Sequence, residues 1–437
     1  RRRNGDEPVT YLHPLLKGAL EKTLGIPLFQ EQLMQMAIDI SGFTAAEADQ
    51  LRRAMGSKRS RARMEQLKER LFAGMFERGV TPDVGEQIWN KLVAFANYGF
   101  PESHSISFAY LVYSSSWIKL HYPAAFCAAL LNAQPMGFYS PHSLVQDARR
   151  HGVGARPPEV NRSGVDATLE VLSAAEESPP IMVPGADAIE RERYDHGWAV
   201  RLGLNSVRSI GGDLAATIVA GQPYVSIEDV ARRTGCNREQ LEALATSGAL
   251  AGLPADGSSS RRRDLWESGA VANAVGSDRL PGIVTGLHAP PLPGMSDQEV
   301  ALADLWSTGV AADGHPTIFL RPALEARGVV RASDLSTIDH GAKVLVGGVV
   351  THRQRPATAS GTTFIGMEDE TGLMNIVVSV GCWQRYRKVA RGAPALLIRG
   401  RVERQGAVVN IVAEKIEPLP IGSDPAGNAP IGSRDFR

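Results

Sequence analysis

Five short runs rich in valine and isoleucine follow one another near the end of the chain, and they restrict the fold there more than any other feature. They are Lys343–His352, Thr363–Asp369, Leu373–Val378, Ala395–Glu403 and Ala407–Ile416. Such runs, separated by turn residues, predict strands. Glu370-Thr371-Gly372 and Gln405-Gly406 predict tight hairpin turns, and Cys382–Ala390 predicts a helix after the third strand. The order strand-strand-strand-helix-strand-strand predicts a five-stranded OB-fold β-barrel over residues 336–418, with a tail at 419–437.

The predicted barrel is basic. Lys343 to Lys415 holds eleven basic and five acidic residues, with aromatic side chains at Phe364, Trp383 and Tyr386. OB-folds bind single strands of nucleic acid through a basic groove and stacking aromatic rings. We expect Arg353 and Arg355, in the loop after the first strand, to contact a DNA backbone. Phe364 faces either the core or the groove, and the core is favoured.

Residues 1–150 predict an all-helical region. The expected helices are Gln30–Ile40, a helix from the capping box Thr44–Glu47 to about Gly56, Arg61–Arg78, a helix from Thr81-Pro82 to Ala96, Ser105–Tyr122, and a short helix from Pro123 to Asn132. The fold class is therefore multidomain α+β, with helices first and a barrel last.

The stretch from Asn97 to Tyr122 is the most distinctive in the helical region. Asn97 to Pro101 predicts a turn, and dense apolar residues after Ser105 predict a helix buried on most sides. Between them, Ser103, His104 and Ser105 form an expected polar loop on a rigid support, where ligands are commonly bound. The alternative is an ordinary turn before a capped helix, and spacing alone favours it.

Charge is uneven along a chain whose formal net charge is zero. Between Arg52 and Arg70 there are eight basic residues against two acidic ones, which is the usual footprint of a phosphate-bearing partner. A solvated helix face is the plain alternative. The planar donors of Arg52 and Arg53 suit a triphosphate or a DNA backbone. Lys58, Arg59 and Arg61 extend the cluster and are expected to contact DNA.

The middle of the chain predicts a connector and then a DNA-binding motif. Residues 151–200 are acidic and proline-rich, with short strands expected. Val207–Gly221 resembles a helix-hairpin-helix element, in which backbone N–H groups of Ile210, Gly211 and Gly212 meet a DNA phosphate. The usual hairpin has Gly at the first turn position, and here Ser209 stands there.

A second, weaker hairpin copy runs from Val230 to Thr246, giving a tandem over residues 201–265. Leu253–Asp264 is expected to be a flexible basic loop in which Arg261, Arg262 and Arg263 are solvated, with contact to DNA as the alternative. Residues 266–335 predict a linker and a helical segment, including a helix at about Asp297–Ser307.

Composition excludes several classes of protein. No stretch approaches the roughly 20 apolar residues that span a bilayer, so no membrane partner is expected. Cys127, Cys236 and Cys382 are far apart, which argues against a zinc site or a disulfide framework. The chain begins Arg-Arg-Arg-Asn, without an initiator Met or a signal peptide. We expect a cytoplasmic chain that is incomplete at its start.

Three blocks in order carry a family resemblance: PLFQEQLMQMA (Pro27–Ala37), ADQLRRAMGSKR (Ala48–Arg59) and YGFPESHSISFAYLVY (Tyr98–Tyr113). They resemble the fingers region of bacterial C-family DNA polymerases, relatives of the DNA polymerase III alpha subunit, and are most similar to the error-prone, damage-tolerant branch. The resemblance runs from Arg1 to Arg437. It implies that the fingers close over the incoming nucleotide, that Arg52 and Arg53 contact its phosphates, and that Ser103, His104 and Ser105 lie near its pocket.

The resemblance also implies a metal requirement that this sequence does not meet. The family's polymerases use Mg²⁺ held by a D-x-D palm motif and a third Asp, and no D-x-D occurs here. Two hypotheses follow. The chain is the C-terminal portion of an error-prone polymerase that binds DNA and deoxynucleoside triphosphates, together with other damage-tolerance components, without catalysing alone. Otherwise it is a stand-alone, non-catalytic DNA-binding accessory protein.

Overall fold

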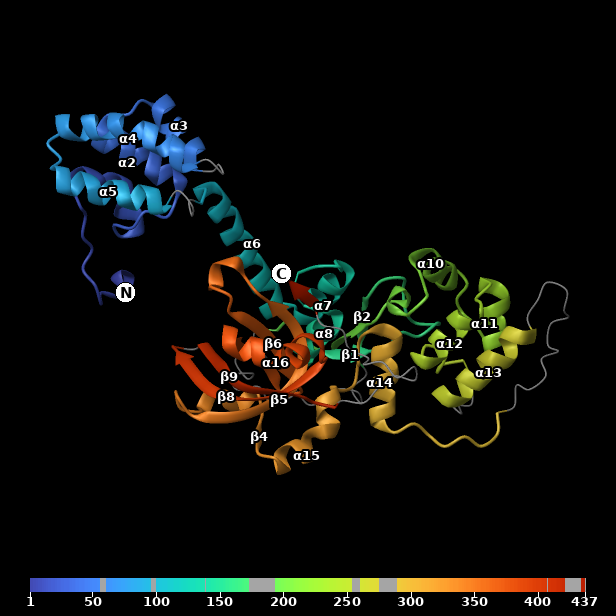
Figure 1. Ribbon diagram of the computed structural model, residues 1–437. Coiled ribbons are helices and arrows are strands. Elements are labelled where there is room, and N and C mark those ends of the chain that lie inside the picture. The colour runs from blue at the N-terminus through green and yellow to red at the C-terminus, as the bar shows by residue number, and fades with distance from the viewer. Residues whose placement is uncertain are drawn as a thin grey trace. The chain divides into compact units, whose positions relative to one another are not determined.

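The computed structural model describes residues 1–55, 60–95, 100–137, 139–172, 193–253, 260–274, 289–406, 408–420 and 434–436, and the side chains of 54–66, 95, 357 and 434–436 lie outside this description (Figure 1). The chain divides into two compact units, Arg1–Trp117 and Ile118–Arg437. The division falls within the long helix α6 (Glu102–His121).

The first unit is helical, as the sequence predicts. Its elements are η1 (Arg2–Asn4), η2 (Pro14–Leu16), α1 (Lys17–Leu20), η3 (Glu21–Thr23), α2 (Gln30–Ser41), α3 (Ala45–Met55), α4 (Ser60–Glu77), α5 (Pro82–Phe95) and the first part of α6. Along α2, Leu33, Met36 and Ile40 recur at the spacing of one helix face and are buried. They pack with Leu51 and Leu71 in one core.

The predicted capping box at Thr44 is confirmed. The Thr44 backbone N–H donates to Glu47 Oε2 over 2.8 Å, and the Glu47 N–H donates back to Thr44 Oγ1 over 3.3 Å. Two backbone donors at the start of α3 are thereby satisfied. This cap fixes where α3 begins, and so where Arg52 and Arg53 lie on it.

Helix α6 differs from the prediction in two respects. It begins at Glu102, so Ser103, His104 and Ser105 belong to its first turn and the expected polar loop is wrong. It is also not buried on most sides, since Tyr110 and Tyr113 are 72% and 75% exposed within the described structure. Apolar content alone predicted burial because a helix that is apolar all round usually packs on every side.

The second unit opens with helices and a small sheet. Helices α7 (Pro123–Asn132) and α8 (Pro141–Arg150) precede β1 (Gly154–Arg156), β2 (Thr168–Val171) and β3 (Trp198–Arg201), whose order in the sheet is β1-β3-β2. The Ser140 hydroxyl accepts from the Ser143 N–H and caps α8. The short strands expected in the connector are therefore present, and residues 173–192 lie outside the described part.

The helix-hairpin-helix region is a compact helical cluster. Its elements are η4 (Leu204–Ser206), α10 (Gly212–Ala220), α11 (Ile227–Thr234), α12 (Arg238–Thr246) and α13 (Arg261–Ala274), with α14 (Asp297–Thr308) following. Ile218, Val230, Leu244 and Val271 lie in its core. Arg261 opens α13 and bonds to Asp304 over 2.6 Å, so the expectation of solvated loop arginines at 261–263 is wrong.

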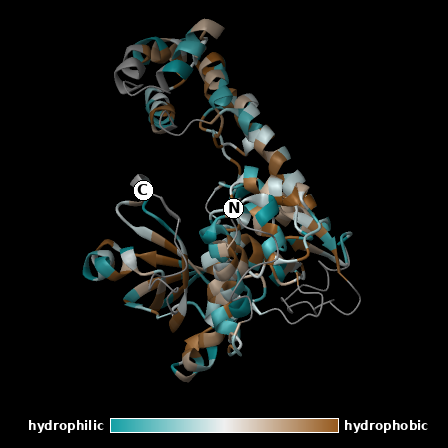
Figure 2. Cartoon of the chain, turned by 90° about the vertical axis from the view of Figure 1, so that its right-hand side faces the viewer, coloured by the Kyte–Doolittle hydropathy of each residue, from teal (hydrophilic) through white to brown (hydrophobic). Residues whose placement is uncertain are grey.

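The last module is a closed five-stranded barrel, as predicted. Its strands are β5 (Lys343–Gln354), β6 (Thr363–Asp369), β7 (Gly372–Val378), β8 (Ala395–Gln405) and β9 (Val408–Pro418), with α16 (Val380–Gly392) between β7 and β8. The sheet order is β5-β6-β7-β9-β8, and β5 also pairs with β8, which closes the barrel. The strands are largely brown in Figure 2, the colour of apolar residues.

Shorter elements border the barrel. η5 (Pro316–Leu320), α15 (Arg321–Ala326), β4 (Val329–Val330) and η6 (Ser333–Thr337) precede it, η7 (Ala357–Ala359) lies after β5, and β10 (Arg434–Phe436) pairs parallel with the end of β5. Phe364 is 37% exposed and lies outside the core, contrary to the favoured prediction. In the described residues, no helix is both long enough and apolar enough to cross a membrane.

Candidate nucleotide and DNA sites

The paired arginines on α3 are held by one carboxylate. Arg52 donates to Asp49 Oδ1 through Nε and Nη2, over 3.0 and 2.8 Å, and Arg53 Nε donates to Asp49 Oδ2 over 2.7 Å. The Arg52 hydrogen bond holds the pKa of Asp49 below its usual range. Both arginine side chains stay partly exposed. The pair with Asp49 therefore presents one net positive charge and a planar donor surface.

The predicted residues near the nucleotide pocket form the first turn of α6. The exposed His104 ring lies between two aromatic rings, with centroids 4.9 Å from Phe100 and 4.4 Å from Phe108. The Glu102 N–H donates to Glu31 on α2 over 2.9 Å, which fixes the helix start against the first unit. Ser105 Oγ donates to the Pro101 carbonyl over 3.3 Å. The turn is thus anchored while His104 and Ser103 stay at the surface.

The two predicted nucleotide-binding groups therefore stand on different elements, α3 and α6, of the same unit. Lys58 and Arg59 fall outside the described residues, and Arg61 lies in α4 with its side chain undescribed. The basic cluster is described only at Arg52, Arg53 and beyond Leu67.

The first hairpin has an open turn. Gly211 is the N-cap of α10 in an extended conformation, and Gly212 is its first helical residue. A Cβ atom on either glycine would meet nothing within 4 Å. The first N–H groups of a helix have no intrahelical acceptor, so this open turn suits the approach of a phosphate oxygen. Ser209 has a left-handed φ of 63°, the conformation that the usual glycine adopts most readily.

An acidic side chain borders that turn, which the sequence did not reveal. Ser209 Oγ donates to Glu239 Oε1 over 2.6 Å, and Gln240 Nε2 donates to the Ser209 carbonyl over 3.4 Å. Glu239 and Gln240 belong to the first turn of α12. The two hairpins thus meet through their helix N-termini. The Glu239 carboxylate would repel a DNA phosphate that approaches this turn.

The second hairpin has the expected form. α11 is capped at its C-terminus by Gly235, whose φ is 70°, and α12 begins after Asn237. The Asn237 side chain accepts from the Gln240 N–H over 3.0 Å, and Gln240 Oε1 accepts from the Asn237 N–H over 2.9 Å. This reciprocal cap stabilises the start of α12.

Arg353 and Arg355 of the barrel differ in their roles. Arg353 is 5% exposed, and its guanidinium donates to the carbonyls of Ala390 and Ala393 over 2.6 and 2.5 Å at the end of α16. Arg353 is therefore a buried side chain that attaches α16 to the barrel, contrary to the prediction that it contacts a DNA backbone. Arg355 is exposed in the following loop and stays available to a phosphate.

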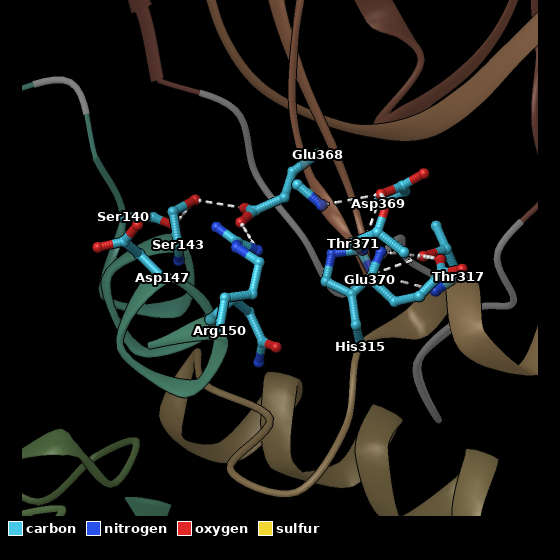
Figure 3. A network of polar contacts seen from close by, with 12 residues as sticks. Ser140, Ser143, Asp147, Arg150, His315, Thr317, Glu368, Asp369, Glu370 and Thr371 are labelled. Carbon is cyan, nitrogen blue, oxygen red and sulfur yellow. Dashed lines mark hydrogen bonds and ion pairs between the residues drawn. The ribbon is translucent and has the colours of Figure 1, made fainter. Parts of the chain in front are cut away.

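The acidic triplet Glu368-Asp369-Glu370 forms a polar network that joins the barrel to earlier elements (Figure 3). Glu368 accepts from Arg150 Nη1 and Ser143 Oγ of α8, each over 2.9 Å. Burial raises the pKa of Glu368, and Arg150 and Ser143 oppose that rise. The pair lies in the interior, where a charge needs a partner.

The other two acids bind the segment before the barrel. Arg321 donates to Glu370 Oε1 over 2.5 Å and to Asp369 Oδ2 over 3.1 Å. Thr317 Oγ1 donates to Glu370 Oε2 over 2.6 Å, and the Ala332 N–H donates to Asp369 Oδ2 over 2.9 Å. The triplet therefore has a structural role. This role could not be predicted from its position at a hairpin turn.

Two buried histidines lie beside this network. His142 of α8 and His315 stack with ring centroids 5.3 Å apart. Burial lowers the pKa of His142 to about 3 and lowers that of His315 well below its usual range. Both rings are therefore neutral near pH 7 and pack as core residues.

The described residues do not fit a pair of Mg²⁺ ions. Across these ranges, no group of three or more His, Cys, Asp or Glu side chains gathers as metal ligands. Glu368, Asp369 and Glu370 are bound to Arg150, Arg321 and backbone N–H groups instead.

Two family models match the chain. Residues 1–79 match the bacterial DNA polymerase III alpha subunit finger domain, and residues 152–263 match the helix-hairpin-helix motif. The first contains Arg52 and Arg53, and the second contains both hairpins.

Curated relatives match the whole chain. It is 53% identical over 446 residues to an error-prone DNA polymerase of Nocardia farcinica, and 51% identical over 444 residues to one of Mycolicibacterium paratuberculosis. Both matches include 100% of this chain but only 36% and 37% of the relatives, so the chain spans little more than a third of their length. A solved asparaginyl-tRNA synthetase of Pyrococcus horikoshii, at 21% identity, covers 20% of this chain and 22% of its own, with a TM-score of 0.18, too small an overlap to bear on function.

The finger match, the helix-hairpin-helix match and the barrel follow one another along the chain in the order that the sequence analysis predicts. Over its full length the chain matches the C-terminal part of bacterial error-prone DNA polymerases, with a DNA polymerase III alpha subunit finger match, a helix-hairpin-helix match and an OB-like barrel in that order.

Proposed function

We propose that this chain supplies the nucleotide-binding and DNA-binding part of template-directed DNA synthesis across damaged templates. The observation that carries this proposal is the match of its full length to error-prone DNA polymerases. Its substrates would be primer-template DNA and deoxynucleoside triphosphates. A cytoplasmic location follows from the proposal, because the bacterial chromosome lies there.

The roles divide between the two units. In the first unit, Arg52 and Arg53 would bind the triphosphate, and the exposed first turn of α6 with Ser103, His104 and Ser105 would lie near the nucleotide. In the second, Ile210, Gly211 and Gly212 would meet duplex phosphates and Arg355 would meet the single-stranded template. The exposure of Ser103, His104 and Arg355 and the open turn at Gly211 and Gly212 support this assignment. Ile210 is buried and its N–H donates to the Val207 carbonyl over 3.0 Å, so the phosphate contact would fall to the two glycines.

We infer that the 437 residues alone do not polymerise. Nucleotidyl transfer needs carboxylates that hold two metal ions, and neither a D-x-D motif nor a fitting cluster in the described residues is available. The Mg²⁺ ligands would then be supplied outside these residues, together with other damage-tolerance components. The second candidate is a stand-alone DNA-binding accessory protein, favoured by the hairpins and the barrel but not by the finger match.

The test combines binding and extension by the 437-residue chain. We expect binding to primer-template DNA and to a deoxynucleoside triphosphate, and no primer extension with Mg²⁺. Extension above background that disappears without Mg²⁺ would overturn the proposed inactivity. DNA binding without any nucleotide binding would favour the accessory protein.

A double variant, Arg52→Ala with Arg53→Ala, tests the triphosphate site. Nucleotide affinity should fall by more than tenfold, since two charge-assisted contacts are lost, and DNA affinity should fall less. Arg3→Ala with Lys17→Ala removes two exposed charges from the same unit as a control. Equal losses for DNA and nucleotide would leave a general basic face rather than a triphosphate site.

A further inference from the structure

An open groove of about 680 Å³ runs along α13 beside α12 and Leu292. Trp266, Leu265 and Leu292 line it and are 48%, 40% and 37% exposed. Gly269 lies one turn beyond Leu265, and a Cβ atom there would meet nothing within 4 Å. Three large apolar side chains thus remain exposed around one hollow.

The groove is not the edge of the hairpin core. Along α13, Arg262, Leu265, Trp266 and Gly269 recur at the spacing of one helix face. Val271 lies in the hairpin core instead and is fully buried. The helix therefore has one apolar side that stabilises the fold and a second that faces solvent.

An arginine stands at each end of the groove. Arg261 Nη1 donates to the Thr246 carbonyl over 3.1 Å, so the start of α13 adjoins the end of α12 and the two helices run antiparallel. Arg262 and Arg238, each near the start of its helix, therefore lie at opposite ends. Each is fixed by one carboxylate, Arg238 by Glu242 and Arg262 by Glu299, over 2.7 Å in both cases.

The groove adjoins the first hairpin turn. Arg238, the first residue of α12, lines it, and the next two residues, Glu239 and Gln240, are hydrogen-bonded to Ser209. A DNA strand whose phosphate sits at the open turn of Gly211 and Gly212 would thus pass directly to Arg238 and Trp266.

We propose that this groove binds an unpaired nucleobase of single-stranded DNA, stacked on Trp266, with the flanking phosphates near Arg238 and Arg262. Guanidinium groups at both ends of an apolar floor match the alternation of phosphate and base along a single strand. The proposal rests on the proposed DNA-binding function of the hairpins. Continuity with the hairpin turn favours DNA over a protein segment as the occupant.

The paired carboxylates set the expected salt dependence. Glu242 and Glu299 balance the two arginines, so the groove contributes by stacking rather than by net charge. Release of counterions governs the salt dependence of phosphate contacts, and stacking adds little to it. The gain from an unpaired base should therefore persist at higher salt.

The experiment compares a blunt duplex with the same duplex carrying a short single-stranded overhang that contains 2-aminopurine. The wild-type 437-residue chain should prefer the overhang and change the 2-aminopurine fluorescence. Trp266→Ala should remove that preference, by roughly five- to a hundredfold in affinity, and leave blunt-duplex affinity unchanged. Trp266→Phe should retain most of it, and Trp198→Ala, which truncates another exposed tryptophan of this unit, should change nothing.

The outcomes separate this inference from the proposed function. If the wild-type chain binds neither DNA, the hairpin proposal fails as well. If it binds the blunt duplex but Trp266→Ala keeps the overhang preference, the groove is not a nucleobase site and a protein segment becomes the better occupant. A loss of both affinities with a lowered melting temperature would be structural, and Trp266→Phe then decides. Loss of overhang preference in that folded variant as well would overturn stacking on this ring.

Discussion

The guanidinium of Arg150 donates to the carboxylate of Glu368 over 2.9 Å across 218 positions of sequence. The two side chains are 8% and 1% exposed. This buried ion pair fastens α8 to strand β6, so the barrel and the helices before it are held together by charge as well as by apolar packing. Removing one partner leaves the other charge buried.

Arg150→Met should therefore destabilise the second unit by about 3–5 kcal/mol. Urea denaturation of the 437-residue chain, followed by circular dichroism, measures the change. Arg331→Ala is the control, because the Arg331–Glu325 pair is 44% and 50% exposed and such pairs contribute about 1 kcal/mol or less. Equal effects of the two substitutions would contradict a buried role for Arg150.

The same variant should depend on pH in a defined direction. Burial already raises the pKa of Glu368, and loss of Arg150 removes the largest opposing cause. A carboxyl whose folded pKa lies above its unfolded value destabilises the fold increasingly as pH rises through that window. The deficit of Arg150→Met should be larger at pH 8 than at pH 5. A deficit that grows on acidification would show that Glu368 remains ionised.

Glu239→Gln should strengthen duplex DNA binding. The substitution removes a carboxylate bonded to Ser209 at the open hairpin turn, while the amide keeps an acceptor for Ser209 Oγ. Affinity at low salt should rise by roughly fivefold, the scale of one nearby charge in a mostly aqueous setting. Glu325→Gln on α15 makes the same change in net charge away from the hairpins. If both variants gain equally, the effect is general and Glu239 has no local role.

Asp49→Asn should raise the affinity for a deoxynucleoside triphosphate. Asp49 binds both Arg52 and Arg53, and its lowered pKa keeps it ionised at neutral pH. Losing its charge leaves two cations to face the phosphates, with a gain of roughly three- to tenfold. Asp39→Asn, whose carboxylate accepts from Gln35, is the control. A fall in affinity would show that Asp49 positions the arginines instead of competing for them.

Arg353, on β5, and Arg355, in the loop after it, should give opposite phenotypes. Arg353→Ala removes the donors to the Ala390 and Ala393 carbonyls and should lower stability by about 1–3 kcal/mol without a specific effect on single-strand binding. Arg355→Ala should leave the melting temperature unchanged and reduce the salt slope of DNA binding by about one. Melting curves and binding at several salt concentrations separate them. The reverse pattern would restore Arg353 as the DNA contact.

Local signals account for most of the fold. The cap at Thr44, Pro82 at the start of α5 and the valine-rich runs of β5 to β9 each act over a few residues, so the sequence predicts their elements closely. The turn at Gly211 and Gly212 was also predicted from the sequence, although glycine turns between helices are common and the motif alone is a weak signal.

Contacts between side chains that are distant in sequence could not be predicted. Arg261 appeared to be a solvated loop residue because its partner Asp304 lies 43 positions away. The sequence around Glu368 did not predict its contact with Arg150, and the sequence around Glu239 did not predict its contact with Ser209. Phe364 was expected to favour the core, but Ile365 and Met367 occupy the inward positions of β6. The alternation of side chains along a strand therefore places Phe364 on the outer face.

The closure of the barrel through β5 and β8 bears on how quickly the chain folds. Lys343 pairs with Arg401 and Val349 with Ala395, so the barrel cannot close until distant segments meet. The helices of the first unit rest on nearer contacts, such as those between α2 and α3. Proteins with local contacts fold faster than those with distant strand pairings. During synthesis the helical unit leaves the ribosome and can fold first, while the barrel can close only after β8 and β9 have been synthesised.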